Sequence, residues 1–180
     1  MKDFELDIKP VALLAFALIY FFDESGFVAL VLPAAAVHEL GHFLAMKMGG
    51  LRLRCLRLGL FGPELDYWGS LSGPWGAAAL AAGPLAGLMY FALCMLFPYE
   101  YCRLSGEMSL ALSCFNLIPV LPLDGGRLAQ LALGDVNFKI SRVICFLFAG
   151  VAFVLWISKG WFSLFAIALW LVWANNKNRG

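Results

Sequence analysis

The chain has 180 residues, of which 62% are hydrophobic and 14% are charged, and its net charge is +1. Soluble globular proteins are about half apolar, so this composition excludes an ordinary soluble domain and predicts a helical membrane protein. The near-neutral charge gives no sign of a nucleic-acid partner. The five cysteines follow no CxxC or CxxH spacing, and we therefore expect free thiols rather than a disulfide framework.

Six apolar segments follow one another along the chain and are the candidate membrane helices. A helix that crosses a bilayer needs about 20 apolar residues, and the first, fourth and sixth segments are short by that measure. Acidic residues precede the first segment and no small-residue cleavage site follows it, so we expect a membrane helix there rather than a signal peptide. We therefore predict an all-α membrane protein with about six transmembrane helices. The segments are 8–22, 27–48, 75–97, 108–121, 140–158 and 161–174.

The basic residues predict how these segments are oriented in the lipid bilayer. If the six segments alternate in direction, all but two of the 13 Lys and Arg residues lie on one side, the exceptions being Arg103 and Lys159. Cytoplasmic loops carry such an excess of basic residues. The distribution predicts a multi-pass membrane protein with both termini in the cytoplasm. We expect the membrane to be that of a prokaryotic cell.

The second apolar segment holds the only two histidines of the chain, His38 and His42, with Glu39 between them. This is the HExxH pattern of zinc peptidases. Residues four apart share one helix face, so both imidazoles can reach one ion, and the glutamate can reach a water molecule beside it. Ionisable side chains are costly in hydrocarbon and are therefore candidates for function. The alternative is a chance match, in which two buried histidines and a glutamate would lack partners in an apolar helix.

A catalytic zinc ion takes three protein ligands and leaves one position for water. Because the chain has no third histidine, the remaining ligand has to be a carboxylate or a thiolate. Asp124 is the better candidate, since it lies in the apolar segment 116–126, where Pro119 and Pro122 break or kink the helix. Irregular backbone at membrane depth is tolerated where it lines a cavity, and an aspartate there is well placed to meet a cation. Glu39 would then be the general base.

Three alternatives remain open for this segment. Asp124, Gly125 and Gly126 are also typical turn residues, so the aspartate could serve an ordinary turn. Cys114 is the rival third ligand, because thiolates also bind zinc. Asn116 could simply satisfy the backbone of a kinked helix.

The HExxH motif on one membrane helix, followed by NxxPxxPLDGG over residues 116–126, resembles the site-2 protease family of intramembrane zinc metalloproteases. The sequence AGPLAG at 82–87 is similar to the GPxxG segment of that family. The resemblance covers roughly residues 27–130 and is closest to the sporulation-type branch, whose substrates include membrane-tethered transcription-factor precursors.

The resemblance also implies a cofactor and a role for each residue of the motifs. It implies one zinc ion per chain, bound by His38, His42 and Asp124, with Glu39 as the catalytic base and Asn116 holding the extended backbone of the substrate. The chain has no room for the PDZ domain of some relatives and ends directly after the last apolar segment, so we expect neither a PDZ nor a CBS domain.

Small residues form one face of the segment 75–97. They include Gly83 and Gly87, which are four apart, and several neighbouring alanines. Such a face lets two membrane helices approach closely, so we expect helix packing there and assign it no chemistry.

Residues 51–58 alternate apolar and basic side chains and then shift phase, which predicts a strand with a bulge. Residues 64–67 could pair back as a second short strand, which gives a cytoplasmic hairpin-like segment. Two interpretations remain open: a basic membrane anchor, or an edge strand that captures an unwound substrate by strand addition.

These observations predict a single polytopic domain over residues 1–180, with core motifs in 27–130 and two C-terminal helices in 139–175. The predicted function is hydrolysis of a peptide bond within or near the transmembrane segment of a membrane protein. One alternative is a non-proteolytic cation carrier or sensor, which should show a polar route to the far side of the membrane. Another is an inactive scaffold, which should lack Glu39.

Overall fold

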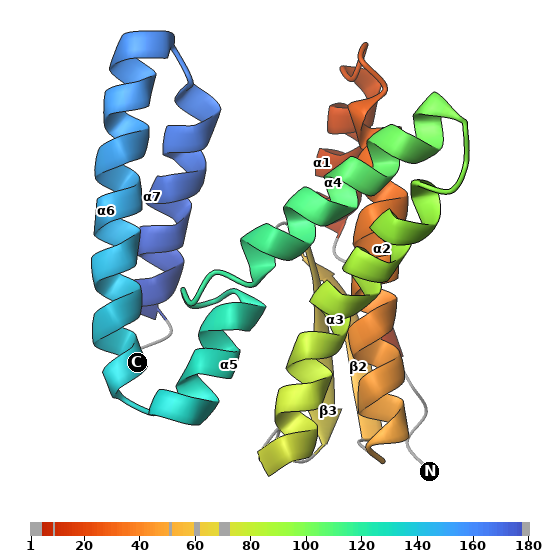
Figure 1. Ribbon diagram of the computed structural model, residues 1–180, viewed down its shortest axis with the longest axis vertical. Coiled ribbons are helices and arrows are strands. Elements are labelled where there is room, and N and C mark those ends of the chain that lie inside the picture. The colour runs from red at the N-terminus through yellow and green to blue at the C-terminus, as the bar shows by residue number, and fades with distance from the viewer. Residues whose placement is uncertain (1–4, 9, 51, 60–61, 69–72, 178–180) are drawn as a thin grey trace. The chain divides into compact units, whose positions relative to one another are not determined.

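The computed structural model describes residues 5–8, 10–50, 52–59, 62–68 and 73–177. The chain divides into two compact units, Met1–Ser113 and Cys114–Gly180, and each is treated by itself. The first unit contains a small sheet and most of four helices, and the second contains three helices (Figure 1). In chain order the elements are β1 (Glu5–Ile8), α1 (Pro10–Phe21), α2 (Phe27–Met48), β2 (Arg52–Gly59), β3 (Gly62–Trp68), α3 (Gly73–Cys94), α4 (Glu100–Asn116), α5 (Asp124–Leu133), α6 (Val136–Lys159) and α7 (Phe162–Lys177).

Each of the six predicted apolar segments overlaps a helix, but not all of these helices are built alike. Within the described residues, α2, α3 and α6 are long and apolar enough to cross a membrane. The helices α1 and α7 have only 12 and 16 residues, and α4 begins eight residues before the predicted segment, in a charged first turn. The structure therefore supports three candidate spans where about six were predicted. It also adds α5, a 10-residue helix that the sequence analysis missed.

The segment expected to be hairpin-like forms the antiparallel strands β2 and β3, with a register shift between Leu53 and Cys55. The strand β1, which was not predicted, pairs in parallel with β2 from Cys55 to Leu58. The strand order is β1-β2-β3, so β2 is the middle strand. Of the two interpretations left open for residues 51–58, the edge strand is therefore wrong where β1 pairs, because both sides of β2 already have partners there.

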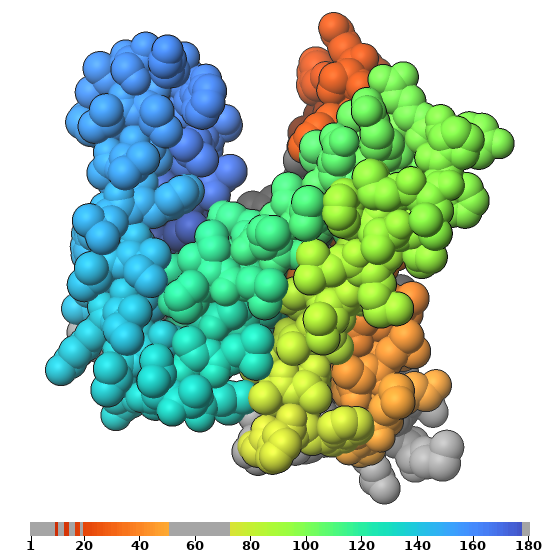
Figure 2. All heavy atoms as spheres, in the orientation of Figure 1, coloured from red at the N-terminus to blue at the C-terminus, as the bar shows by residue number. Residues whose placement is uncertain are grey.

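The helices α2 and α3 pack side by side in the first unit (Figures 1 and 2). A Cβ atom at Gly41 would lie 2.5 Å from the carbonyl oxygen of Ala82 and 2.7 Å from the Cβ of Ala86. The predicted small-residue face is thus the surface of α3 on which α2 packs. Close helix packing of this kind requires residues without bulky side chains.

Three buried serines on α4 face the other helices of the first unit. The hydroxyl of Ser105 donates to the carbonyl oxygen of Leu30 at 2.9 Å, and the hydroxyl of Ser109 donates to that of Gly87 at 2.9 Å. A Cβ at Gly87 would overlap the hydroxyl of Ser113. The helix α4 is therefore held by small polar contacts to backbone, which explains why it is less apolar than α2 or α3.

In the second unit, α6 and α7 pack as an antiparallel pair (blue in Figures 1 and 2). Their core is a cluster of Val120, Leu123, Cys145 and Leu171. Many large apolar side chains of α6, including Leu147 at 66% exposed, point outward instead. Exposed apolar surface on this scale is expected where a helix faces lipid rather than water.

Candidate metal centre

The start of α2 is set by a carboxylate that caps its first turn. Gly26, directly before the helix, has a φ of 70°, which favours glycine. Asp23 accepts hydrogen bonds from the backbone N–H of Phe27 at 3.0 Å and of Val28 at 2.6 Å, and from the hydroxyl of Ser25 at 2.6 Å. These hydrogen bonds, led by that of Ser25, lower the pKa of Asp23 because they favour the charged form. The cap fixes where α2 begins.

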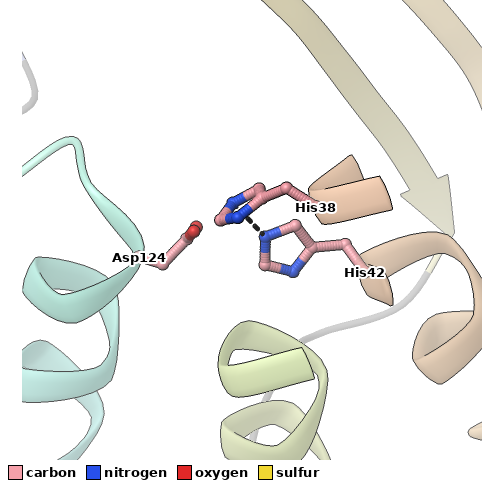
Figure 3. Close-up of side chains that lie close together, drawn as sticks. All are labelled: His38, His42 and Asp124. Carbon is pink, nitrogen blue, oxygen red and sulfur yellow. Dashed lines mark hydrogen bonds between the residues drawn. The ribbon is translucent and has the colours of Figure 1, made fainter. Parts of the chain in front are cut away.

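His38 and His42 lie one turn apart on α2, and both are buried, at 4% and 6% exposed. Their Nε2 atoms are 3.3 Å apart and face each other (Figure 3). Two nitrogen ligands at about 2.0–2.1 Å from a tetrahedral zinc ion lie about 3.4 Å apart. The two imidazoles therefore present their nitrogen atoms at the spacing that one metal ion needs.

The ring of His42 is oriented by α3. Its Nδ1 donates a hydrogen bond to the carbonyl oxygen of Ala79 at 2.8 Å, since a carbonyl can only accept. In the neutral ring the proton on Nδ1 leaves a lone pair on Nε2, as a metal ligand requires. Pro84 lies in the next turn of α3. Because proline has no N–H, the helix hydrogen bond to the carbonyl four residues earlier is missing there.

Gly83 makes room for this histidine. A Cβ atom at Gly83 would overlap the Nε2, Cε1 and Cδ2 atoms of His42. The small-residue face was assigned to packing alone, and the structure shows that part of what packs against it is the imidazole of a candidate ligand. Sequence reasoning missed Ala79 and Gly83 as partners of the site, although the glycine-proline pair at 83–84 was a usable signal.

Asp124 is the first residue of α5. The helix N-terminus carries partial positive charge, which favours an ionised carboxylate. A Cβ at Gly125 would overlap the backbone of Leu117, and a Cβ at Gly126 would overlap that of Val120. The interpretation of Asp124 to Gly126 as an ordinary turn is therefore wrong: these residues begin a helix, and the two glycines let the preceding segment fold back against it.

The three candidate ligands come together in the structure. His38, His42 and Asp124 each offer one ligand atom, and these atoms all lie within 4.8 Å of one another (Figure 3). The donor set of two imidazoles and one carboxylate is one that zinc accepts in catalytic sites. Cys114, the rival third ligand, is exposed and is not a member of this group.

Of the other two predicted site residues, Glu39 lies on the helix of the two histidines and Asn116 lies on a different helix. Glu39 follows His38 on α2 and is half-buried. Asn116 is the last residue of α4 and is also half-buried. The irregular segment between Asn116 and Asp124 replaces the helix that the two prolines were predicted to break, and that prediction is confirmed.

Comparison with known proteins gives relatives by sequence and by structure. No family model matches the chain. It is 38% identical over 113 residues to "Putative zinc metalloprotease sll0528" of Synechocystis sp., a match that covers 57% of this chain and 30% of that protein. It is 30% identical over 130 residues to "Putative zinc metalloprotease Rip3" of Mycobacterium tuberculosis, covering 63% and 32%. The chain thus spans about a third of the length of the curated relatives it matches.

The fold is that of a solved protein named as a site-2 protease from Methanocaldococcus jannaschii. The two structures align with a TM-score of 0.70 over 98% of this chain and 91% of that one, at 19% sequence identity. Within the described residues, three helices are long and apolar enough to cross a membrane, and His38, His42 and Asp124 are buried side chains that could hold a metal ion. In sequence the chain is similar to two proteins named as putative zinc metalloproteases, and in fold it is similar to a protein named as a site-2 protease.

Proposed function

We propose that the chain is an intramembrane zinc metalloprotease that hydrolyses a peptide bond within or near the transmembrane segment of a membrane protein. The observation that carries this proposal is the pair of buried imidazoles, with their Nε2 atoms 3.3 Å apart, beside the carboxylate of Asp124. Two relatives named as zinc metalloproteases support zinc as the ion, at one per chain. A catalytic rather than structural site is supported by the number of ligands, because three leave one position open.

Each residue of the site has a proposed role. His38, His42 and Asp124 would hold the zinc ion, which when bound supplies a Lewis acid that acidifies water and polarises a carbonyl. Glu39 would take a proton from the attacking water as the oxygen bonds to the peptide carbon, and would pass it to the departing amine nitrogen. Asn116 would bind the extended backbone of the substrate through its side-chain amide, which both donates and accepts hydrogen bonds.

The membrane arrangement is part of the same proposal. We infer a single domain with six membrane helices. Among the described residues, α2, α3 and α6 are the helices that are long and apolar enough to cross a membrane. Both termini and the hairpin of β2 and β3 would face the cytoplasm, as the distribution of basic residues favours, and the cell would be prokaryotic. The partners would then be the lipid bilayer and a membrane-embedded protein substrate.

Substitution of the proposed base separates hydrolysis from metal binding. Purified Glu39→Gln protein should contain about one zinc per chain, as the unsubstituted protein also should, because Glu39 is not a proposed ligand. Cells that carry Glu39→Gln as the sole copy should accumulate a membrane protein that control cells cleave. Zinc without any accumulated protein would instead favour a cation carrier or sensor. Absence of zinc from the unsubstituted protein would overturn the proposal.

A further inference from the structure

The segment between α4 and α5 is irregular, and its backbone groups need partners if it lies at membrane depth. Pro119 and Pro122 have no N–H group to satisfy. Three of the other N–H groups bond within the local chain: Ile118 to the carbonyl of Phe115 at 3.2 Å, Val120 to that of Ile118 at 2.7 Å, and Leu123 to that of Val120 at 2.9 Å.

The N–H of Leu121 is the exception, because its partner is a side chain of another helix. It donates to the hydroxyl oxygen of Ser141 on α6 at 2.9 Å. The hydroxyl proton of Ser141 is in turn donated to Oδ1 of Asn175 on α7, at 2.7 Å. Ser141 therefore accepts from Leu121 and donates to Asn175 at the same time, and Asn175 fixes the direction of the hydroxyl proton so that a lone pair faces Leu121.

A second polar side chain of α6 holds the other side of Asp124. The Nδ2 of Asn137 donates to the carbonyl oxygen of Gly126 at 2.8 Å. Asn137 and Ser141 are four residues apart and are both 0% exposed, and Asn175 is 4% exposed. The two contacts fall at Leu121 and Gly126, so they bracket the candidate ligand Asp124 along the chain.

We propose that Asn137, Ser141 and Asn175 are positioning residues that fix the segment 117–126 and thereby orient Asp124 as a metal ligand. The proposal rests on the proposed zinc site and deepens it. Deleting an outer-shell hydrogen-bond partner of a metal ligand typically weakens metal affinity by about 10- to 100-fold, and we expect loss of the contacts that hold the segment around Asp124 to act in the same direction. A purely structural role in joining α6 to α7 would lower thermal stability without changing the metal affinity of the folded protein.

The test is a zinc-affinity titration of the purified, folded full chain against a chromophoric chelator. Ser141→Ala and Asn137→Ala should each weaken zinc binding by roughly tenfold or more. Asn175→Ala should do so to a similar extent, and combining it with Ser141→Ala should add little, because both remove one chain of hydrogen bonds. Ser141→Thr, which keeps the hydroxyl, should restore most of the affinity.

Cys145→Ala is the matched control. Cys145 lies one turn beyond Ser141 on α6, is 2% exposed, and packs in the same core cluster as Val120 and Leu123. Its truncation should lower the midpoint of thermal unfolding but leave zinc affinity within about twofold. It removes packing and weak thiol contacts to Ser141 and Leu171, but it leaves in place the hydrogen bonds from Leu121 to Ser141 and from Ser141 to Asn175. A tenfold loss in Cys145→Ala would show that any core truncation disturbs the metal, and would overturn a specific positioning role.

Hydrogen exchange of the peptide that contains Leu121 gives a readout that needs no metal. Protection should fall in Ser141→Ala and Asn175→Ala and remain in Cys145→Ala. If Ser141→Ala does not fold, the milder variant Asn175→Ser tests the proposal by zinc affinity and by hydrogen exchange of the same peptide. Unchanged affinity and unchanged exchange in the variants would overturn the inference while the zinc site stands. Absence of zinc from the unsubstituted chain would instead overturn the proposed function.

Discussion

Proline has different effects on the helices of the two units. In the first unit, Pro33 and Pro84 lie inside α2 and α3, and both helices continue past them. Pro33 leaves the carbonyl of Ala29 without its helix partner, and the hydroxyl of Tyr101 on α4 donates to that oxygen at 2.7 Å. One missing donor is thus replaced by one side chain from a neighbouring helix, and the helix remains intact.

In the second unit two prolines follow within one turn, and the helix ends. Pro119 and Pro122 lie between α4 and α5, and the hydroxyl of Ser141 accepts the hydrogen bond of Leu121 that no local carbonyl takes. The comparison shows two ways to place a candidate metal ligand. An intact helix sets His38 and His42 by its own periodicity, whereas Asp124 depends on a broken segment that other helices must hold.

The largest expected effect follows from removing the ligand on the broken segment. Asp124→Ala should lower zinc affinity by more than the roughly 10- to 100-fold expected for an outer contact, because a direct ligand is lost. Metal content after dialysis against a chelator measures this. Asp135→Ala, an exposed acidic residue in the same unit, is the control and should retain zinc. Full zinc content in Asp124→Ala would remove Asp124 from the ligand set.

At the intact helices, Gly83→Ala should weaken zinc binding nearly as much as Asp124→Ala does. The added methyl group would overlap the ring of His42, which would have to rotate away from Ala79. Overpacking of a well-packed interior costs about 1–3 kcal/mol. Gly150→Ala on α6 is the matched control, since a Cβ there would meet nothing within 4 Å. Equal zinc affinity in the two alanine variants would show that Gly83 only packs helices.

A smaller effect, on stability, is expected at Pro33 of α2, where the hydroxyl of Tyr101 replaces the missing helix hydrogen bond. Tyr101→Phe leaves the Ala29 carbonyl without the hydroxyl, and should reduce the free energy of unfolding by about 1 kcal/mol. In a Pro33→Ala background the new N–H can bond to that carbonyl, so the same substitution should have less effect. Thermal unfolding of the four proteins in detergent measures the coupling. Additive effects would mean that the hydroxyl does not compensate for the proline.

The sequence predicted the features that depend on local spacing. His38 and His42 were found because a four-residue spacing on a helix is sufficient to bring two side chains together. The break before Asp124 was found because proline removes a donor wherever it stands. The strand β1 was missed, since four residues that pair in parallel with Cys55 to Leu58, about fifty positions away, carry no local signal.

The contacts that hold the candidate ligands were missed for a related reason. Ala79 lies on α3 and orients His42 on α2, and Ser141 lies on α6 and holds the segment before Asp124. Each partnership depends on how two helices pack, which one sequence does not contain. A buried serine or asparagine in an apolar helix does indicate that some backbone group needs it, although not which group.

The smallest expected effect concerns the carboxylate that caps α2, and it depends on pH. The pKa of Asp23 is lowered from its usual value of 3.8 by hydrogen bonds from Ser25, Val28 and Phe27. A carboxyl with a lowered folded-state pKa stabilises the folded state at pH values above its ordinary pKa, and the contribution is lost as the pH falls through the lowered pKa. Protection of the Phe27 and Val28 amides against hydrogen exchange should therefore decline in acid below about pH 4.

Asp23→Asn should remove this pH dependence, because an amide cannot titrate, while Glu24→Gln on the next residue should preserve it. The effect should remain confined to the first turn of α2, since capping acts on the first orphan N–H groups alone. The histidines lie three turns further along, so zinc affinity at neutral pH should be unchanged in Asp23→Asn. A loss of zinc in that variant would show that α2 needs its N-terminal cap to place His38 and His42. It would contradict the comparison, in which the helix places them by its own periodicity.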